Sequence, residues 1–165
     1  MQLFLVRHAH AVTAEENPAR PLSARGREDA LRIATFLQRT SCFRPAQVWH
    51  SPLRRAHESA RALVNVIDPE AVLVETDGLL PDDDPEGMAE RLSKYPVDHH
   101  LALVGHDPHL SALGSLLIAG RPYPERFTMR KGAVLALERT DRIHKKSGFR
   151  RWQVRWHLSP ELLPA

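Results

Sequence analysis

The sequence predicts an α/β fold in which a mainly parallel sheet is covered by helices on both faces, as a three-layer sandwich. Two observations lead to this prediction. Short, continuous apolar runs, typical of buried parallel strands, alternate with segments whose apolar residues recur at helical spacing. The length of 165 residues suits one domain, residues 1–165, and no internal repeat or linker divides it.

The amino-terminal half supplies two strands and two helices. Strands are predicted at residues 3–6, an apolar run that ends at Arg7, and at residues 47–50. Ser23 is a good N-cap for a first helix, whose apolar positions are Ala30, Ile33, Ala34 and Leu37. A second helix begins near Leu53, and its apolar positions are Ala56, Ala60, Leu63, Val64 and Ile67.

The carboxy-terminal half continues the alternation and then changes character. Strands are predicted at residues 71–75 and 101–104. Asp84-Pro85 and Asp107-Pro108 each look like an N-cap followed by proline in the first helical position, and Gly120 ends the second of these helices. Two strands follow at residues 133–138 and 149–157, joined by the polar segment 140–148. In the last strand the residues predicted to share the apolar face are Trp152, Val154 and Trp156.

Composition excludes several classes of protein. The net charge of +3 is too small to indicate a nucleic-acid binder, and the single cysteine, Cys42, excludes a disulfide framework and a cysteine-based zinc site. The apolar run at residues 3–6 is far shorter than a signal peptide or a membrane span, so we expect a soluble, cytoplasmic protein. Residues 121–157 hold 11 Lys and Arg against 3 Asp and Glu; we interpret them as an exposed strand pair, with a surface for an acidic partner as the alternative.

Three predicted strands end in basic or imidazole side chains: Arg7-His8, residues 50–55, and Gly105-His106. Ligands of parallel sheets bind beyond the carboxyl ends of the strands, so we expect these groups to lie close together. Arginine presents a planar fork that matches phosphate oxygens, and a histidine among arginines is kept neutral and therefore nucleophilic. The sequence thus predicts a site for a phosphoryl dianion that needs no metal or cofactor.

Four segments resemble, in order, the motifs of the histidine phosphatase superfamily. They are LVRHAHA from Leu5, RPLSARGRE from Arg20, SPLRRA from Ser51 and LVGHDP from Leu103. The small size, the Arg-Pro-Leu-Ser segment and the closing WHLSPELL look most like the SixA-type phosphohistidine phosphatase branch. The resemblance implies a phosphoglycerate-mutase-like fold and a cofactor-independent phosphatase, acting on protein phosphohistidine or on a small phosphorylated molecule rather than on nucleic acid or a membrane.

The resemblance also implies catalytic residues. His8 would be the nucleophile that forms a phosphohistidine intermediate, and Arg7, Arg55 and His106 would line the phosphate pocket and stabilise the transition state. Arg55 takes this role rather than Arg54 because the arginine of the motif directly precedes an alanine.

Two further residues are expected to bind substrate. Arg20 would reach the pocket from its rim, and Ser51 would shape the turn that presents Arg55. We expect His10 and His109 to border the pocket as well.

The sequence departs from the pattern of the superfamily at two points. Ala9 stands where the motif has glycine, which removes easy access to positive φ; a residue as small as alanine should be tolerated. The general acid of larger members has no clear counterpart, although Asp82, Asp83 and Asp84 lie in the matching stretch. A serine alkoxide needs a proton to leave, whereas an imidazole leaves readily, so a weak general acid favours phosphohistidine as the substrate.

Three alternatives remain open at this point. A metal site could use His8, His10, His106 and His109 with Asp107, but the flanking arginines would repel a divalent cation. A small-molecule phosphoester phosphatase of the same superfamily would share the pocket. A non-catalytic phosphate-binding module would bind phosphoproteins without turnover.

Overall fold

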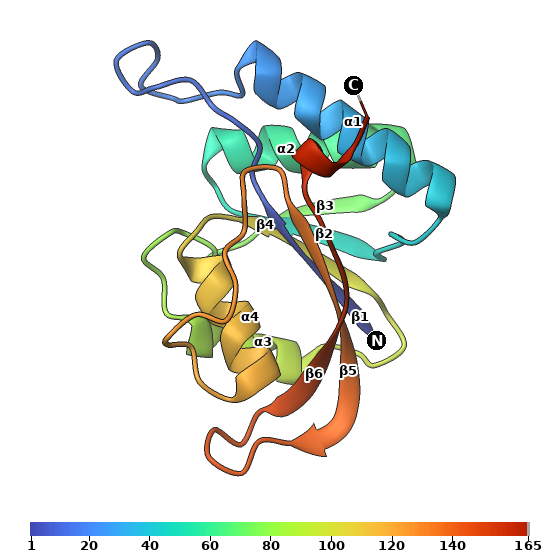
Figure 1. Ribbon diagram of the computed structural model, residues 1–165, viewed down its shortest axis with the longest axis vertical. Coiled ribbons are helices and arrows are strands. Elements are labelled where there is room, and N and C mark those ends of the chain that lie inside the picture. Colours follow the sequence, from blue (N-terminus) through green and yellow to red (C-terminus); the bar gives the residue numbers. More distant parts are fainter. Residues whose placement is uncertain (165) are drawn as a thin grey trace.

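The computed structural model describes residues 1–164, which form a mixed six-stranded sheet with helices on both faces (Figure 1). The strands are β1 (Gln2–Arg7), β2 (Gln47–His50), β3 (Val72–Glu75), β4 (Leu101–Gly105), β5 (Val134–Ile143) and β6 (Arg150–Leu158). The helices are α1 (Ala24–Thr40), α2 (Arg54–Ile67), α3 (Pro85–Lys94), α4 (His109–Ala119) and the short 3-10 helix η1 (Pro160–Leu162). The predicted α/β architecture is confirmed.

The strand order β3-β2-β4-β1-β5-β6 decides which chain segments meet. The first four strands of this order run parallel, whereas β5 is antiparallel to β1 and β6 is antiparallel to β5. Since β4 lies between β1 and β2, the residues that follow these three strands emerge at the same edge of the sheet. The segment that precedes β5 reaches the same edge from the opposite direction.

Two hydrophobic clusters, one on each face, explain why the central strands are continuously apolar. In β1, Leu3 and Leu5 pack in the cluster that contains residues of α3 and α4. Phe4 and Val6 pack in the cluster that contains residues of α1 and α2. Successive side chains of a strand point to opposite faces, so a strand covered on both sides must be apolar at every position.

The helix ends largely follow the predicted capping. The side chain of Ser23 accepts a hydrogen bond from the amide of Gly26, and Gly120 ends α4 with a φ of 76°. The start of α4 differs from the prediction, because Pro108 occupies the N-cap position and the helix begins at His109. Asp107 instead accepts hydrogen bonds from the amide and hydroxyl of Ser111, at 3.3 and 2.9 Å.

The β5–β6 pair corrects two predictions. Strand β5 extends to Ile143, well into the segment expected to be a polar connection. In β6 a register shift pairs Ala136 with Trp156 and Leu137 with Val154, which leaves one residue of β6 unpaired as a β-bulge. The bulge reverses the alternation, so Trp152 and Trp156 pack in different clusters and Val154 is 50% exposed. The predicted single apolar face of this strand is therefore wrong.

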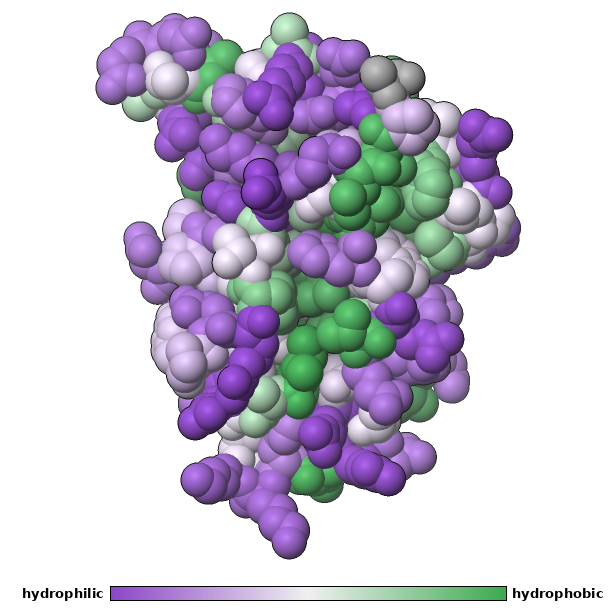
Figure 2. All heavy atoms as spheres, in the orientation of Figure 1, coloured by the Kyte–Doolittle hydropathy of each residue, from purple (hydrophilic) through white to green (hydrophobic). Residues whose placement is uncertain are grey.

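The surface of the molecule carries both hydrophilic and hydrophobic residues (Figure 2). The loop between β1 and α1 projects from the sheet edge and is mostly hydrophilic, while hydrophobic residues gather over β6 and the carboxy-terminal segment (Figures 1 and 2). Within residues 1–164, no helix combines the length and the apolar character that crossing a bilayer requires.

Candidate active site

Two histidines meet at the carboxyl edge of the sheet. His8 directly follows β1 and His106 directly follows β4, and these strands are neighbours in which Arg7 is paired with Gly105. The two ring centroids are 4.9 Å apart, and the residues are only 6% and 2% exposed. The expected meeting of strand ends therefore takes place, and it produces a nearly buried pair of imidazoles.

The hydrogen bonds of His8 determine which of its nitrogens carries the proton. Nδ1 lies 2.7 Å from the carbonyl oxygen of Ala9, and because a carbonyl only accepts, Nδ1 must be the donor. Nε2 therefore carries a lone pair, and Nε of Arg55 donates to it at 3.3 Å. Burial lowers the pKa of His8 to about 4, assisted by the positive charges of Arg55, Arg7 and Lys131 and opposed by the bond to Ala9. His8 is thus a neutral imidazole with a nucleophilic nitrogen near physiological pH.

His106 is also held neutral. Its pKa is lowered to about 3 by burial first, and then by the neighbouring His8, Arg55 and Arg7. Its Nε2 is hydrogen-bonded to Oγ of Ser51 at 2.9 Å.

Ser51 lies beside His106, inside the site rather than on its surface. It is completely buried, and its Oγ contacts His106 and accepts a longer hydrogen bond, 3.3 Å, from the amide of Leu53. The structure therefore places Ser51 as a residue that orients His106 and the turn before α2.

Arginine side chains surround the imidazole pair, as expected. Nη1 of Arg7 donates to the carbonyl oxygen of Met129 at 2.5 Å and lies 3.4 Å from Oδ2 of Asp107. Its Nε is buried and has no hydrogen-bond partner within residues 1–164. Arg54, by contrast, forms an ion pair with Glu58 at 2.7 Å, while Arg55 contacts His8. The choice of Arg55 over Arg54 agrees with this geometry.

Arg20 has an unusual backbone conformation, in the left-handed region. Its φ is +47°, and its Nε donates to the carbonyl oxygen of Val12 at 3.3 Å. The positive charge of Arg20 lies close enough to lower the pKa of Arg55, after the larger effect of burial. Arg20 thus lies near Arg55, and its place at the rim of the pocket stays a prediction.

Lys131 is a cation of this region that the sequence analysis did not single out. It lies just before β5, where the amide of the next residue, Gly132, donates to the carbonyl oxygen of His8 at 3.1 Å. Burial lowers the pKa of Lys131, followed by the charges of Arg7, Arg20, Arg25 and Arg55. Only the antiparallel pairing of β5 with β1 brings this residue to the histidines, and no local motif signals it.

The histidines expected to border the pocket differ from each other. His10 is partly exposed, and its Nδ1 lies 2.8 Å from Oγ of Ser23. His109 is 1% exposed in the first turn of α4, so its expected position at the rim is wrong. For the metal alternative, the described residues contain no group of three or more His, Cys, Asp or Glu side chains arranged to hold an ion.

The local backbone accounts for the positions of Ala9 and of two of the acidic residues at 82–84. Ala9 is buried, and its φ is not positive, so the extra methyl group is accommodated without strain. Asp84 caps α3 through the amide of Glu86 at 3.0 Å, and Asp83 accepts from the amide of Leu80 at 2.7 Å. Asp82 is exposed. Both Asp83 and Asp84 are thus engaged by the backbone.

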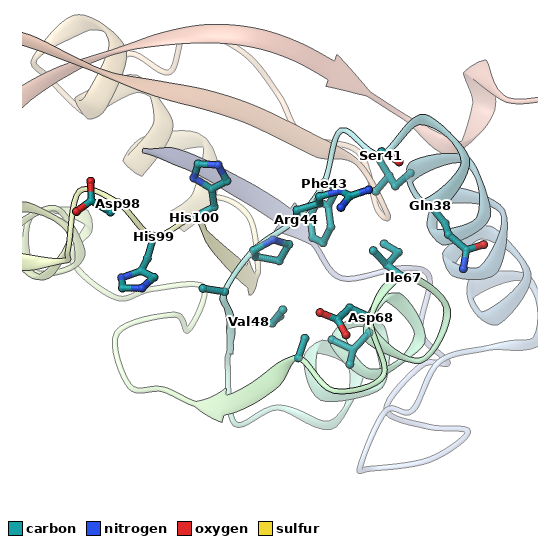
Figure 3. Close-up of a pocket in the computed structure, with 15 residues that line it drawn as sticks. Gln38, Ser41, Phe43, Arg44, Val48, Ile67, Asp68, Asp98, His99 and His100 are labelled. Atoms are coloured by element: carbon teal, nitrogen blue, oxygen red, sulfur yellow. The ribbon is translucent and has the colours of Figure 1, made fainter.

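An apolar pocket lies away from the predicted site. A cavity of about 520 Å³ opens between the carboxyl ends of α1 and α2 and the segment before β4 (Figure 3). Phe43, Val48 and Ile67 form apolar walls, and His99 lies on its border. This cavity holds none of the predicted site residues, because it lies at the amino edge of the parallel strands.

Comparisons with known proteins agree with this fold. Residues 3–80 match the model of the histidine phosphatase superfamily (branch 1). The chain is similar to the protein histidine phosphatase SixA complexed with tungstate, at a TM-score of 0.81 and 19% identity over 98% of this chain and 99% of that chain. It is also similar to the α-ribazole phosphatase from Shigella flexneri, at a TM-score of 0.72 and 20% identity over 93% of this chain and 95% of that chain.

A third similar structure is the mycobacterial glucosyl-3-phosphoglycerate phosphatase, at a TM-score of 0.67 and 18% identity over 93% of this chain and 96% of that chain. The sequence matches none of the curated proteins with which it was compared. The resemblance to the superfamily and the expected phosphoglycerate-mutase-like fold are confirmed, and solved structures with different substrates share that fold.

Proposed function

We propose that this protein is a phosphatase that uses His8 as its nucleophile and acts on protein phosphohistidine. The match of residues 3–80 to the histidine phosphatase superfamily and the fold shared with a solved histidine phosphatase support this proposal. One observation carries the proposal most strongly. The neutral His8 presents an unprotonated Nε2 to Arg55, beside the second imidazole of His106 and the unpartnered Nε of Arg7.

The proposed reaction has two steps. In the first, Nε2 of His8 attacks phosphorus while the bond from phosphorus to the substrate nitrogen breaks. The departing imidazole keeps the electron pair and leaves neutral, because its other ring nitrogen already carries a proton. In the second, water attacks the phosphoryl group on His8, and inorganic phosphate leaves. The guanidinium groups of Arg7 and Arg55 hold the equatorial oxygens in both steps.

Phosphohistidine suits this site because its leaving group, an imidazole, departs readily without a strong general acid. Asp83 and Asp84 each accept a hydrogen bond from a backbone amide, and Asp82 is exposed. Among residues 1–164, none of the three contacts His8, Arg55 or His106 through a hydrogen bond. The second candidate is a small-molecule phosphoester phosphatase, which the likeness to the α-ribazole and glucosyl-3-phosphoglycerate phosphatases supports.

Trapping the phosphoenzyme tests whether His8 is the nucleophile. Brief incubation with labelled phosphohistidine protein should yield a base-stable, acid-labile phosphoprotein that His8→Ala abolishes and that His99→Asn, a change outside the site, retains. Full turnover by His8→Ala would exclude His8 as the nucleophile.

A panel of substrates decides between the candidates. Phosphohistidine protein should be hydrolysed with a higher kcat/KM than a phosphoserine peptide or a sugar phosphate. Preferred hydrolysis of the sugar phosphate would favour the small-molecule candidate, and phosphoprotein binding without turnover would indicate a non-catalytic module.

A further inference from the structure

More cations converge on the proposed phosphate site than one phosphoryl group neutralises. Besides Arg7 and Arg55, the charges of Arg20, Arg25 and Lys131 act on one another there. Arg7 and Arg25 have carboxylate neighbours, at 3.4 and 3.7 Å. The remaining three have no carboxylate within ion-pair distance among residues 1–164, and a phosphoryl dianion compensates two of them.

A groove continues from this site along the surface. It has a volume of about 520 Å³, begins at Arg7, and runs between the start of α1 and the segment of residues 130–131 before β5. Its lining includes five Lys and Arg side chains against three carboxylates. Two of these carboxylates are already paired, Asp29 with Arg25 and Glu161 with Arg130 at 2.9 Å, and the third is Glu28. The groove therefore keeps an excess of positive charge next to the site of reaction.

The groove is open enough for the surface of another protein. The side chains of Arg25 and Arg130 are 79% and 75% exposed, and Lys131 is also exposed. Exposed cations along an open groove can bind acidic side chains of another protein that approach from solvent. A small anion bound in addition to the phosphoryl group is better held in an enclosed pocket.

We propose that this groove, whose lining includes Lys131, Arg25 and Arg130, binds carboxylate side chains that flank the phosphohistidine of a protein substrate. The inference deepens the proposed function and rests on it. It names the substrate class as an acidic phosphoprotein surface. Specificity would arise because the phosphoryl group anchors at Arg7 and Arg55 while the neighbouring carboxylates occupy the groove.

The experiment compares two phosphohistidine peptides that differ only in their flanking residues, Glu in one and Gln in the other. The wild-type protein should hydrolyse the Glu peptide with a kcat/KM about fivefold higher, mainly through a lower KM, and added salt should remove the difference. Lys131→Gln should bring this ratio close to one. Lys145→Gln removes the same charge from an exposed lysine in the β5–β6 turn, at the far end of the molecule, and should keep the ratio. The readout is the ratio of kcat/KM for the two peptides, because the charge of Lys131 also acts on His8. A loss of activity that affects both peptides equally leaves this ratio unchanged.

The outcomes separate the inference from the proposed function. Equal kcat/KM for the two peptides, or a preference that Lys131→Gln leaves unchanged, overturns the groove assignment while phosphohistidine hydrolysis stands. Hydrolysis of neither peptide overturns both. A Lys131-dependent preference for a sugar bisphosphate over the monophosphate, with equal rates for the peptides, would assign the groove to a small molecule instead.

Discussion

Acidification should destabilise this protein through His8, because the folded site keeps this imidazole neutral. The pKa of His8 is about 4 in the folded protein against an ordinary value of 6.5. Between about pH 4 and pH 6.5, His8 is mostly protonated in the unfolded chain but mostly neutral in the folded protein. The free energy of unfolding must therefore fall as the pH falls through this window, and above pH 6.5 the contribution vanishes.

The magnitude follows from the two pKa values. At pH 5, the difference in proton binding at His8 alone lowers the free energy of unfolding by about 2 kcal/mol relative to pH 7. His106, with a pKa of about 3, acts in the same direction. For a domain whose total stability is about 5–15 kcal/mol, such a loss is easily measured.

Urea unfolding at pH 7, 6 and 5 provides the assay, with wild type compared with His8→Asn. The variant has no imidazole at this position, so wild type should lose about 2 kcal/mol more than the variant between pH 7 and pH 5, with equal m-values. Titration of the His8 ring proton by NMR should give a midpoint near the same low value.

Two results would refute the reasoning. The first is an NMR midpoint near 6.5, which would mean that burial and the surrounding cations do not hold His8 neutral. The second is a pair of parallel stability curves for wild type and His8→Asn. Either result would mean that the fold adds nothing to the neutrality that an ordinary imidazole already has near pH 7.

Three further substitutions test other contacts. Arg55→Ala should lower kcat/KM about 100-fold, because the guanidinium proposed to hold the equatorial phosphoryl oxygens in the transition state is lost; an unchanged kcat/KM in steady-state assays would remove Arg55 from the site. Ser51→Ala should lower the free energy of unfolding by about 1–3 kcal/mol, because His106 loses its buried partner; urea unfolding identical to wild type would contradict this. Gly26→Ala should cost about 1–3 kcal/mol in the same measurement, because the new Cβ would lie 1.9 Å from the carbonyl oxygen of His10; a wild-type midpoint would show that the loop yields freely.

The sequence alone determined the order of the elements, the parallel core of the sheet and the meeting of His8, His106 and Arg55. Most of these features follow from local patterns: continuous apolar runs for strands, helical spacing for helices, and polar residues directly after strands. The choice of Arg55 rather than Arg54 came from the resemblance to the superfamily motif. Since the carboxyl ends of parallel strands share one edge, the position of a residue in its own segment is enough to place it at the site.

Only the tertiary structure decided the features that depend on which distant segments pair. The contact of Ser51 with His106, the approach of Lys131 to His8 and the burial of His109 each join elements far apart in the chain. The β-bulge that sends Trp152 and Trp156 to opposite faces depends on the register between β5 and β6, which alternation within one strand does not contain. The basic groove arises in the same way, because the antiparallel pairing of β5 with β1 brings Lys131 beside a phosphate site that the parallel strands had already formed.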